Sequence, residues 1–446
     1  MLEELTREHR IPGAQLCLYR DGKTYNAYTG VERLGGDVLV TPRSRFAYGS
    51  VSKVFTAALV MQLVEEGEAE LDEPVLSFLS GHTVPPGHPM RSVTLRHLLS
   101  HTAGLVSDYE GAPLRSPSLH RYFASVLRAG HFSAPGSAFS YSNTGYAVAA
   151  YAVEVLTGQS WWDSVESYLA RPTGLDLAFV RDPRPGAAPP AIVSGHAVTA
   201  TTGKSSPVDF HVESTLVPAG GIAGSAMDLV RFGRCFLGEG HADLEADIAA
   251  LDVLAQMGHS VPEADPFGIA AGWGAGWGLF PADDGTLWLG HDGTLDGGSC
   301  NVRVSPDGGT ALAFTTNSTT GLAAWEDLVA ELDRSFGLRV GHYRQPAPDD
   351  RPYDSTALLA GEFLNGDLDI QVSLGDGNTL RFAACNGISG DLAVGSDLTF
   401  AVRAADQGDL LFSGRFMSSV PDGPVDLMQY NGRTLFKDSS QARLVA

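Results

Sequence analysis

The fold of this chain is indicated by residues 46–55, which read Phe-Ala-Tyr-Gly-Ser-Val-Ser-Lys-Val-Phe. Ser50 follows a glycine and opens a long apolar run that predicts a helix over residues 51–66. Lys53 comes three residues later, so one helical turn places its ammonium on the same face as the Ser50 hydroxyl. A serine becomes nucleophilic when a neighbour takes its proton. A desolvated lysine can do this, or can lower the pKa of a third group that does.

Lysine is rare in this sequence, and arginine carries most of the positive charge. The four lysines are Lys23, Lys53, Lys204 and Lys437. A lysine inside an apolar helix is therefore unusual here and favours a catalytic interpretation of the Ser-x-x-Lys pattern. The pattern alone also fits a helix N-terminus with an exposed lysine, so other motifs must decide between the two.

The composition limits the classes of protein to consider. The chain has 446 residues and a formal net charge of −22, from 30 basic and 52 acidic residues. Such an acidic protein is repelled by nucleic acid and by anionic membranes, so neither is expected as a partner. No apolar run approaches the roughly 20 residues that span a bilayer. The charged residues 1–8 lack the pattern of a signal peptide, so we expect a cytoplasmic protein.

The first 340 residues mix helical and strand patterns. They predict an α+β domain, residues 1–340, in which helices flank an antiparallel sheet. Thr94 is the expected N-cap of one of its helices. The predicted helices cover residues 51–66, 93–105, 119–130, a segment ending at Leu156, 226–236 and 322–336; strands are expected within 11–40 and 268–320, and a long surface loop at 179–209.

The pattern changes after a Pro-rich stretch that we interpret as a linker, residues 341–354. Residues 355–446 then show short alternating strands separated by turns such as Asn431-Gly432. This pattern predicts a small C-terminal all-β domain, an antiparallel barrel or sandwich.

Two further segments contain residues suited to the chemistry of Ser50 and Lys53. Tyr141-Ser142-Asn143 precedes a predicted helix, and His291-Asp292-Gly293-Thr294 ends a predicted strand. Each alone fits ordinary loop packing or a strand-end histidine. Their value lies in their occurrence together and in this order.

The three segments resemble those of the serine beta-lactamase and penicillin-binding-protein superfamily, in particular its class C beta-lactamase and DD-peptidase branch. The resemblance covers about residues 5–335 and includes the segments 98–105, Leu-Leu-Ser-His-Thr-Ala-Gly-Leu, and 218–221, Pro-Ala-Gly-Gly. It implies a beta-lactamase-like fold and a covalent acyl-enzyme mechanism that needs neither cofactor nor metal.

The resemblance also implies roles for single residues. Ser50 would attack a carbonyl, and Lys53 would keep the local potential positive and so favour a deprotonated Tyr141. Tyr141, as phenolate or phenol, would carry the proton between Ser50, the leaving group and the next nucleophile. Asn143 would hold Lys53 and the substrate amide, and the backbone N–H groups of Ser50 and Thr294 would form the oxyanion hole.

The third motif departs from the common Lys-Thr-Gly of the superfamily. His291 stands in place of the lysine and is only partly charged at neutral pH, which weakens the case for binding a β-lactam or a cell-wall carboxylate. Arg433 is a candidate to reach from the barrel over the site, although an arginine after such a hairpin turn is more commonly solvated. The candidate substrate contacts are Gly220, Gly221, Asp292, Gly293 and Arg433.

Two histidines four residues apart, His97 and His101, raise the alternative of a metal site. No third ligand stands at a matching spacing, so packing or hydrogen bonding is the preferred interpretation. We expect no metal and no cofactor.

Without an export signal, the acyl donor is expected to be cytoplasmic. The chain is similar to stand-alone penicillin-binding-protein-type thioesterases, which cyclise nonribosomal peptides and combine a histidine third motif with a C-terminal lipocalin-like barrel. This similarity implies a peptidyl thioester on a carrier protein, or its small-thiol mimic, as substrate and a head-to-tail macrolactam as product. The alternatives are a D-stereospecific peptidase or esterase, a DD-peptidase or β-lactamase-like hydrolase, and an inactive homologue that serves as a binding module.

Overall fold

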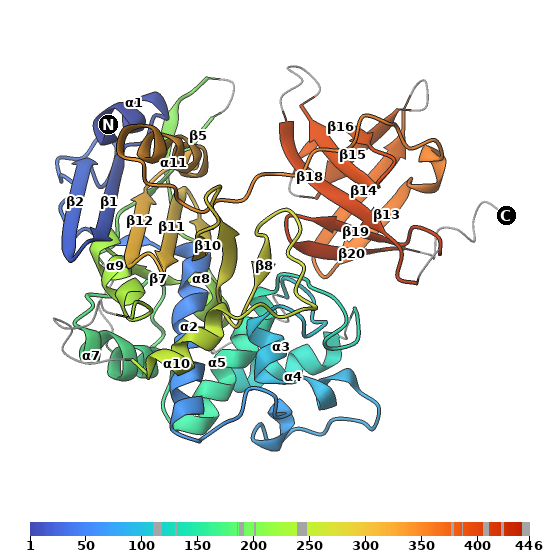
Figure 1. The fold of residues 1–446 in the computed structure, drawn as a ribbon. Helices are drawn as coiled ribbons and strands as arrows, with labels where there is room; N and C mark the ends of the chain where they lie inside the picture. The colour runs from blue at the N-terminus through green and yellow to red at the C-terminus, as the bar shows by residue number, and fades with distance from the viewer. Residues whose placement is uncertain are drawn as a thin grey trace.

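The computed structural model describes residues 1–109, 118–129, 132–184, 186, 191–199, 202–238, 248–375, 379–385, 387–404, 410–420 and 423–438. It confirms the predicted class: an antiparallel sheet flanked by helices, followed by a closed β-barrel (Figure 1). The predicted segments 119–130, 179–209 and 355–446 extend partly into residues outside these ranges. No helix in the described ranges is both long and apolar enough to cross a bilayer.

The main sheet has seven strands in the order β2-β1-β12-β11-β10-β9-β8. Its strands are β1 (Gly13–Arg20), β2 (Lys23–Gly30), β8 (Gly272–Trp273), β9 (Gly278–Pro281), β10 (Leu287–Leu295), β11 (Gly298–Ser305) and β12 (Thr310–Thr316). Strand β11 is buried on both faces. Because successive side chains alternate across a strand, Val302 packs with the large helical core, whereas Arg303 points to the opposite face, toward Trp325. The sheet is therefore the middle layer of three.

Helices cover both faces of this sheet. The described helices are α1 (Leu2–Glu8), α2 (Ser52–Glu65), α3 (Leu95–Leu99), α4 (Leu119–Ala129), α5 (Asn143–Thr157), α6 (Trp161–Ser164), α7 (Arg171–Thr173), α8 (Val217–Gly220), α9 (Ala226–Arg234), α10 (Leu251–Ala255) and α11 (Gly321–Phe336). A π-helical segment, η4 (Val165–Ala170), joins α6 to α7, and the 3-10 helices are η1 (Gly49–Val51), η2 (Val75–Ser77), η3 (Pro89–Ser92), η5 (Ser214–Leu216), η6 (Gln256–Gly258) and η7 (Thr356–Leu358). Helix α2 is buried along almost its whole length, which explains its apolar sequence. Its polar members Ser52, Lys53 and Thr56 are therefore held inside the protein.

Two predictions of local structure were wrong. The helix predicted over 93–105 is limited to α3, with Thr94 as its N-cap as expected, because His101 and Gly104 adopt positive φ angles of 61° and 69°. The segment 179–209 is not all loop. It contains the hairpin β5 (Gly195–Val198) and β6 (Ser205–Val208), while β4 (Ala178–Phe179) overlaps its start and joins β3 (Phe46–Ala47) and β7 (Ile222–Gly224) in a small sheet.

The C-terminal barrel closes in chain order, and its interior is filled with side chains. Its strands are β13 (Gly361–Asn365), β14 (Leu368–Leu374), β15 (Leu380–Ala384), β16 (Ser389–Val394), β17 (Thr399–Arg403), β18 (Leu410–Met417), β19 (Leu427–Tyr430) and β20 (Arg433–Lys437). Phe363, Phe382, Phe400 and Phe416 belong to its core. The division of the chain at 340 and 355 stays a prediction.

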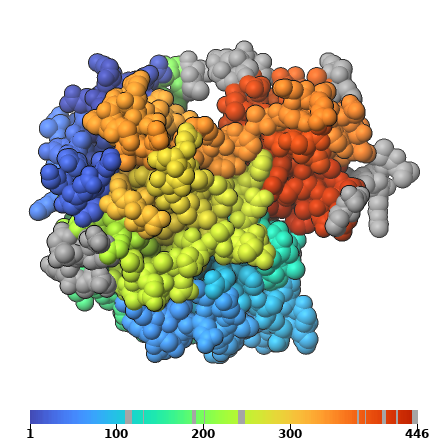
Figure 2. Space-filling model, in the orientation of Figure 1, coloured from blue at the N-terminus to red at the C-terminus, as the bar shows by residue number. Residues whose placement is uncertain are grey.

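The barrel lies directly against the helix-and-sheet part, as the space-filling view shows (Figure 2). The barrel contacts backbone atoms of two loops of that part, one at Ser107 and one at residues 139–141. The backbone N–H of Tyr141 donates to the Gly432 carbonyl at 2.9 Å, and Thr434 Oγ1 donates to the Phe139 carbonyl at 2.7 Å. Ser107 N–H donates to Asn365 Oδ1 at 2.9 Å.

Candidate active site

Ser50 and Lys53 lie where the 3-10 turn η1 continues into α2. The spacing of one helical turn brings Lys53 Nζ to 3.2 Å from Ser50 Oγ. Lys53 is fully buried, and the same nitrogen lies 2.6 Å from Asn143 Oδ1 and 2.7 Å from the Ala219 carbonyl oxygen. The structure thus brings the predicted site residues Ser50 and Asn143 together at the side-chain nitrogen of a third, Lys53.

The surroundings of Lys53 favour its neutral form. Burial lowers the pKa of Lys53 well below its ordinary value, Asp108 opposes this effect, and Arg433 adds to it. A neutral amine has two N–H donors and one lone pair. If the donors serve Asn143 Oδ1 and the Ala219 carbonyl, the lone pair remains for the hydroxyl proton of Ser50. This arrangement suits Lys53 as a base.

Tyr141 is buried beside these two residues. Lys53 Nζ lies 4.8 Å from the centre of its ring. Burial raises the pKa of Tyr141, and the Ser50 hydroxyl and Arg433 only partly oppose this. Among the described residues, the phenol oxygen has no hydrogen-bond partner. Burial thus favours the neutral form of both groups: of the two forms expected for Tyr141 it favours the phenol, and it acts against the expected positive charge on Lys53.

A chain of polar contacts links Lys53 to the barrel. Asn143, the first residue of α5, donates through Nδ2 to Asp108 Oδ1 at 2.5 Å. The other carboxylate oxygen of Asp108 lies 3.3 Å from Arg433 Nη2. Arg433 also lies over the Tyr141 ring, 5.4 Å from its centre. Sequence analysis did not find Asp108, because no motif marks it and its partners are distant in the chain.

His291 is buried on β10 and stays uncharged. Its Nδ1 donates to the Asp292 carbonyl at 2.8 Å, which leaves the lone pair on Nε2. That Nε2 has no hydrogen-bond partner in the part of the chain that the structure describes. Burial is the largest cause of the low pKa of His291, about 3. The neutral ring offers an acceptor where a lysine would offer a positive charge.

His97 and His101 have packing and hydrogen-bonding roles, as preferred from the sequence. His97 Nδ1 accepts the Thr94 backbone N–H at 3.2 Å and so helps to cap α3. His101 Nδ1 accepts the Ser142 N–H at 3.0 Å, and its ring centre lies 4.2 Å from that of Tyr141. Within the described ranges, no group of three potential metal ligands is found.

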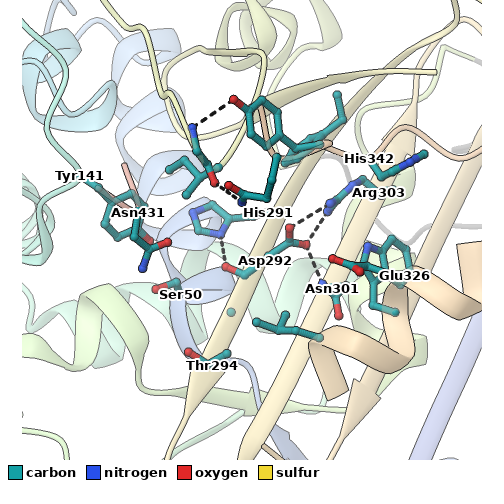
Figure 3. Close-up of a pocket in the computed structure, with 18 of the residues that line it drawn as sticks. Ser50, Tyr141, His291, Asp292, Thr294, Asn301, Arg303, Glu326, His342 and Asn431 are labelled. Carbon is teal, nitrogen blue, oxygen red and sulfur yellow. Dashed lines mark hydrogen bonds and ion pairs between the residues drawn. The ribbon is translucent and has the colours of Figure 1, made fainter. Parts of the chain in front are cut away.

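Asp292 is held by an ion pair that the sequence did not predict. The Arg303 guanidinium, only 1% exposed, makes two contacts to this carboxylate at 2.7 and 2.9 Å. Asn301 Nδ2 donates to the same carboxylate at 2.7 Å. Burial alone would raise the pKa of Asp292, but Arg303 and Asn301 lower it below its usual value. These contacts turn Asp292 toward Arg303 (Figure 3).

Strand β10 passes very close to the Ser50 turn. A Cβ on Gly293 would lie 2.1 Å from the Tyr48 carbonyl oxygen and 2.9 Å from Ser50 N. A Cβ on Gly49, whose φ is +54°, would meet the backbone of Thr294 at 2.5 to 2.7 Å. Only glycine permits both approaches. They bring the backbones of Ser50 and Thr294 together, as the predicted oxyanion hole requires.

A pocket of about 370 Å³ contains Ser50 and extends along β10 (Figure 3). Its walls come from β10, α11, the segment after α11 and the barrel. The lining includes Ser50, Tyr141, Trp273, His291, Asp292, Gly293, Thr294, Arg303, Trp325, Glu326, His342, Tyr343, Gln345, Asn431 and Arg433.

The candidate substrate contacts fall into two groups. Asp292, Gly293 and Arg433 line the pocket. Gly220 and Gly221 are not among its lining residues; they lie behind η1, where a Cβ on Gly220 would be 3.8 Å from Gly49. Their turn instead positions the Ala219 carbonyl to form a hydrogen bond with Lys53 Nζ.

The fold and this cluster define a serine-nucleophile protein of the beta-lactamase type. Residues 1–333 match the family Beta-lactamase. Penicillin-binding protein 4 of Amycolatopsis lactamdurans is 35% identical over 365 residues, which cover 81% of this chain and 95% of that protein. The chain belongs to the beta-lactamase family, within the serine beta-lactamase and penicillin-binding-protein superfamily.

Three solved structures extend this comparison. The crystal structure of SurE is 41% identical, covers 98% of this chain and 97% of its own, and has a TM-score of 0.87; the likeness therefore includes the barrel. A second structure of SurE, with D-Leu, is 40% identical with a TM-score of 0.85 and the same coverage. A D-stereospecific amidohydrolase from Streptomyces sp. is 26% identical, with a TM-score of 0.56, and covers 74% of this chain and 95% of its own.

Proposed function

We propose that this protein is a serine acyltransferase that releases a carrier-bound peptidyl thioester by head-to-tail cyclisation. The observation that carries the proposal is the composition of one pocket. Ser50 shares it with Asn431 and Arg433 of the barrel. A cyclase must keep water from the acyl-enzyme and hold a folded peptide, and a wall contributed by a second structural unit serves both needs.

In the first half-reaction, Lys53 accepts the Ser50 hydroxyl proton as Oγ attacks the thioester carbonyl. The backbone N–H groups of Ser50 and Thr294 stabilise the oxyanion. As the tetrahedral intermediate collapses, the carbon–sulfur bond breaks and the thiolate receives a proton, delivered through Tyr141. The products are a Ser50 ester and a free thiol.

In the second half-reaction, the N-terminal amine of the same peptide attacks the Ser50 ester. The amine loses one proton through Tyr141 and Lys53, the carbon–oxygen bond to Ser50 breaks, and Oγ recovers its proton. The products are the macrolactam and the free enzyme. His291, as an uncharged acceptor, and Arg433, as a donor, both line the pocket and are proposed to bind groups of the peptide.

The acyl-terminal residue is proposed to be a D-amino acid. This rests on the D-Leu in a SurE structure that is 40% identical to this chain along nearly its full length. The net charge of −22 opposes docking of the carrier, because carrier proteins are acidic and like charges repel. A small-thiol thioester therefore tests the chemistry without depending on carrier docking.

A D-stereospecific hydrolase is the second candidate. It is favoured by the likeness to a D-stereospecific amidohydrolase at 26% identity. The two candidates share the Ser50 ester and differ only in whether amine or water removes it.

Mass spectrometry of products from synthetic peptidyl thioesters separates these candidates. Each peptide is prepared with a D- or an L-residue at the acyl end, and with a free or an acetylated N-terminus. We expect macrocycle only from free amines with a D-residue, and no product with Ser50→Ala. Linear acid alone from all free-amine peptides would contradict the cyclase and support the hydrolase.

A further inference from the structure

Asn365 is a buried amide at the end of β13 that joins the barrel to the active-site side. Only 3% of its surface is exposed. Its Oδ1 accepts the Ser107 N–H at 2.9 Å, and its Nδ2 donates to Ser140 Oγ at 3.1 Å and to the Thr434 carbonyl at 2.7 Å. Both N–H donors and the carbonyl oxygen of the amide are thus engaged.

The two loops that Asn365 holds are those that carry site residues. Ser107 directly precedes Asp108, and Ser140 directly precedes Tyr141. Neighbouring barrel atoms support the same contacts, since Thr434 N–H donates to Ser140 Oγ at 3.2 Å.

Hydrogen bonds link Ser107 to Lys53 through Asn143. The Ser107 carbonyl accepts the Asn143 N–H at 2.8 Å, and Asp108 accepts from the Asn143 side chain. Asn143 Oδ1 then contacts Lys53 Nζ at 2.6 Å. Tyr141 is placed by the second branch, through Ser140.

We propose that Asn365 is a positioning residue that sets Tyr141 and the Asp108–Asn143–Lys53 chain for acylation of Ser50. The barrel is then part of the catalytic assembly as well as a wall of the substrate pocket. This inference rests on the proposed function, because it takes Lys53 and Tyr141 as the groups that move the proton. A purely structural Asn365 would affect stability but not the rate of a correctly folded enzyme.

The test is the rate of Ser50 modification by a small fluorophosphonate, followed by intact-protein mass spectrometry in the full-length chain. The variants are Asn365→Ala, Ser140→Ala and the double variant, assayed well below their unfolding temperatures. We expect each single variant to lower the rate at saturating probe by roughly 10- to 100-fold, since small misplacements of catalytic groups carry costs of this order. The probe concentration for half-maximal rate should change little. The slowing in the double variant should be smaller than the product of the two single effects, because the Asn365–Ser140 contact is lost in both.

Val372→Ala is the matched control. Val372 is fully buried in the barrel core, on β14, so its truncation destabilises the barrel without touching the loops. It should lower the unfolding temperature and leave the modification rate unchanged. Wild-type rates for Asn365→Ala, or equal slowing by Val372→Ala, would overturn this inference alone. A wild-type chain that forms no Ser50 adduct would overturn the proposed function and this inference with it.

Discussion

At the scale of single residues, burial sets the protonation states that the site favours for Lys53 and Tyr141. Lys53 lies in an apolar helix, so its charged form is disfavoured and its pKa falls. The same burial raises the pKa of Tyr141. A neutral amine beside a serine hydroxyl and a neutral phenol is a ground state with no charge to neutralise before acylation begins.

Replacing Lys53 tests this arrangement. Lys53→Met should lower the rate of Ser50 acylation by about 10² to 10⁴-fold, the usual contribution of a positioned base. Lys53→Arg should not restore the rate, because a guanidinium does not lose its proton in a protein. Lys23→Met, on the exposed strand β2, is the matched control. Substantial activity in Lys53→Arg would show that the charge of this residue matters rather than its basicity.

The low pKa of His291 predicts how the stability of the fold depends on pH. Its pKa is about 3 in the folded protein and 6.5 in an unfolded chain, so between these values only the unfolded state binds the proton. Stability therefore falls as pH drops through this window, by about 2 kcal/mol between pH 7 and 5. Urea unfolding at the two pH values should show this loss, and His291→Gln should reduce it. Equal pH sensitivity in the variant would contradict the buried, neutral histidine.

The sequence predicts some of these residues and not others. Ser50 and Lys53 are recognisable because helical geometry fixes their relation locally. Asp108, Arg303 and Asn365 have no such signal, since each acquires its role from partners in another element. Asp108, for example, meets Arg433 across 325 positions of the chain.

At the scale of secondary-structure elements, the close contact between β10 and η1 forms the site. Two glycines permit it, one in each element. Gly293→Ala should force the strand away from Ser50 and lower the acylation rate by about 100-fold. Stopped-flow acylation, together with the unfolding temperature, measures the effect.

The control for this substitution is Gly238→Ala. Among the described residues, a Cβ there would meet nothing closer than 3.8 Å, so neither rate nor stability should change much. Normal acylation by Gly293→Ala would mean that the two backbones need not approach so closely.

Element prediction succeeded where the pattern is long and regular. Helix α11 spans Gly321–Phe336, close to the predicted 322–336. It failed at α3, where positive φ angles end the helix early. It also failed at the β5–β6 hairpin, whose strands Gly-His-Ala-Val and Ser-Ser-Pro-Val are too short to show an apolar alternation. Those strands form because β5 packs against the β10–β11 turn: a Cβ on Gly195 would lie 2.0 Å from the Asp296 carbonyl oxygen.

At the scale of the whole molecule, the pocket needs both structural units. Arg433 extends from β20 to the pocket and to Asp108. Arg433→Gln should reduce macrocycle formation from a peptidyl thioester more than it reduces fluorophosphonate acylation, because only the peptide reaches the barrel wall. Parallel product and adduct measurements provide the comparison. An equal loss in both assays would place the effect of Arg433 on Lys53 rather than on the peptide.

The barrel holds the active-site loops partly by their backbone atoms. It engages Tyr141 N–H, Ser107 N–H and the Phe139 carbonyl in this way. It also contacts the side chains of Ser140 and Asp108. Backbone groups are the same in every amino acid, so other side chains of these loops can diverge between relatives while the backbone contacts persist. Asn365, Gly432 and Thr434 are the barrel residues that make these contacts. If a barrel from a relative keeps these three residues, it should bind the same loop atoms in the same arrangement. New substrate preferences can in this way arise by recombination of whole units.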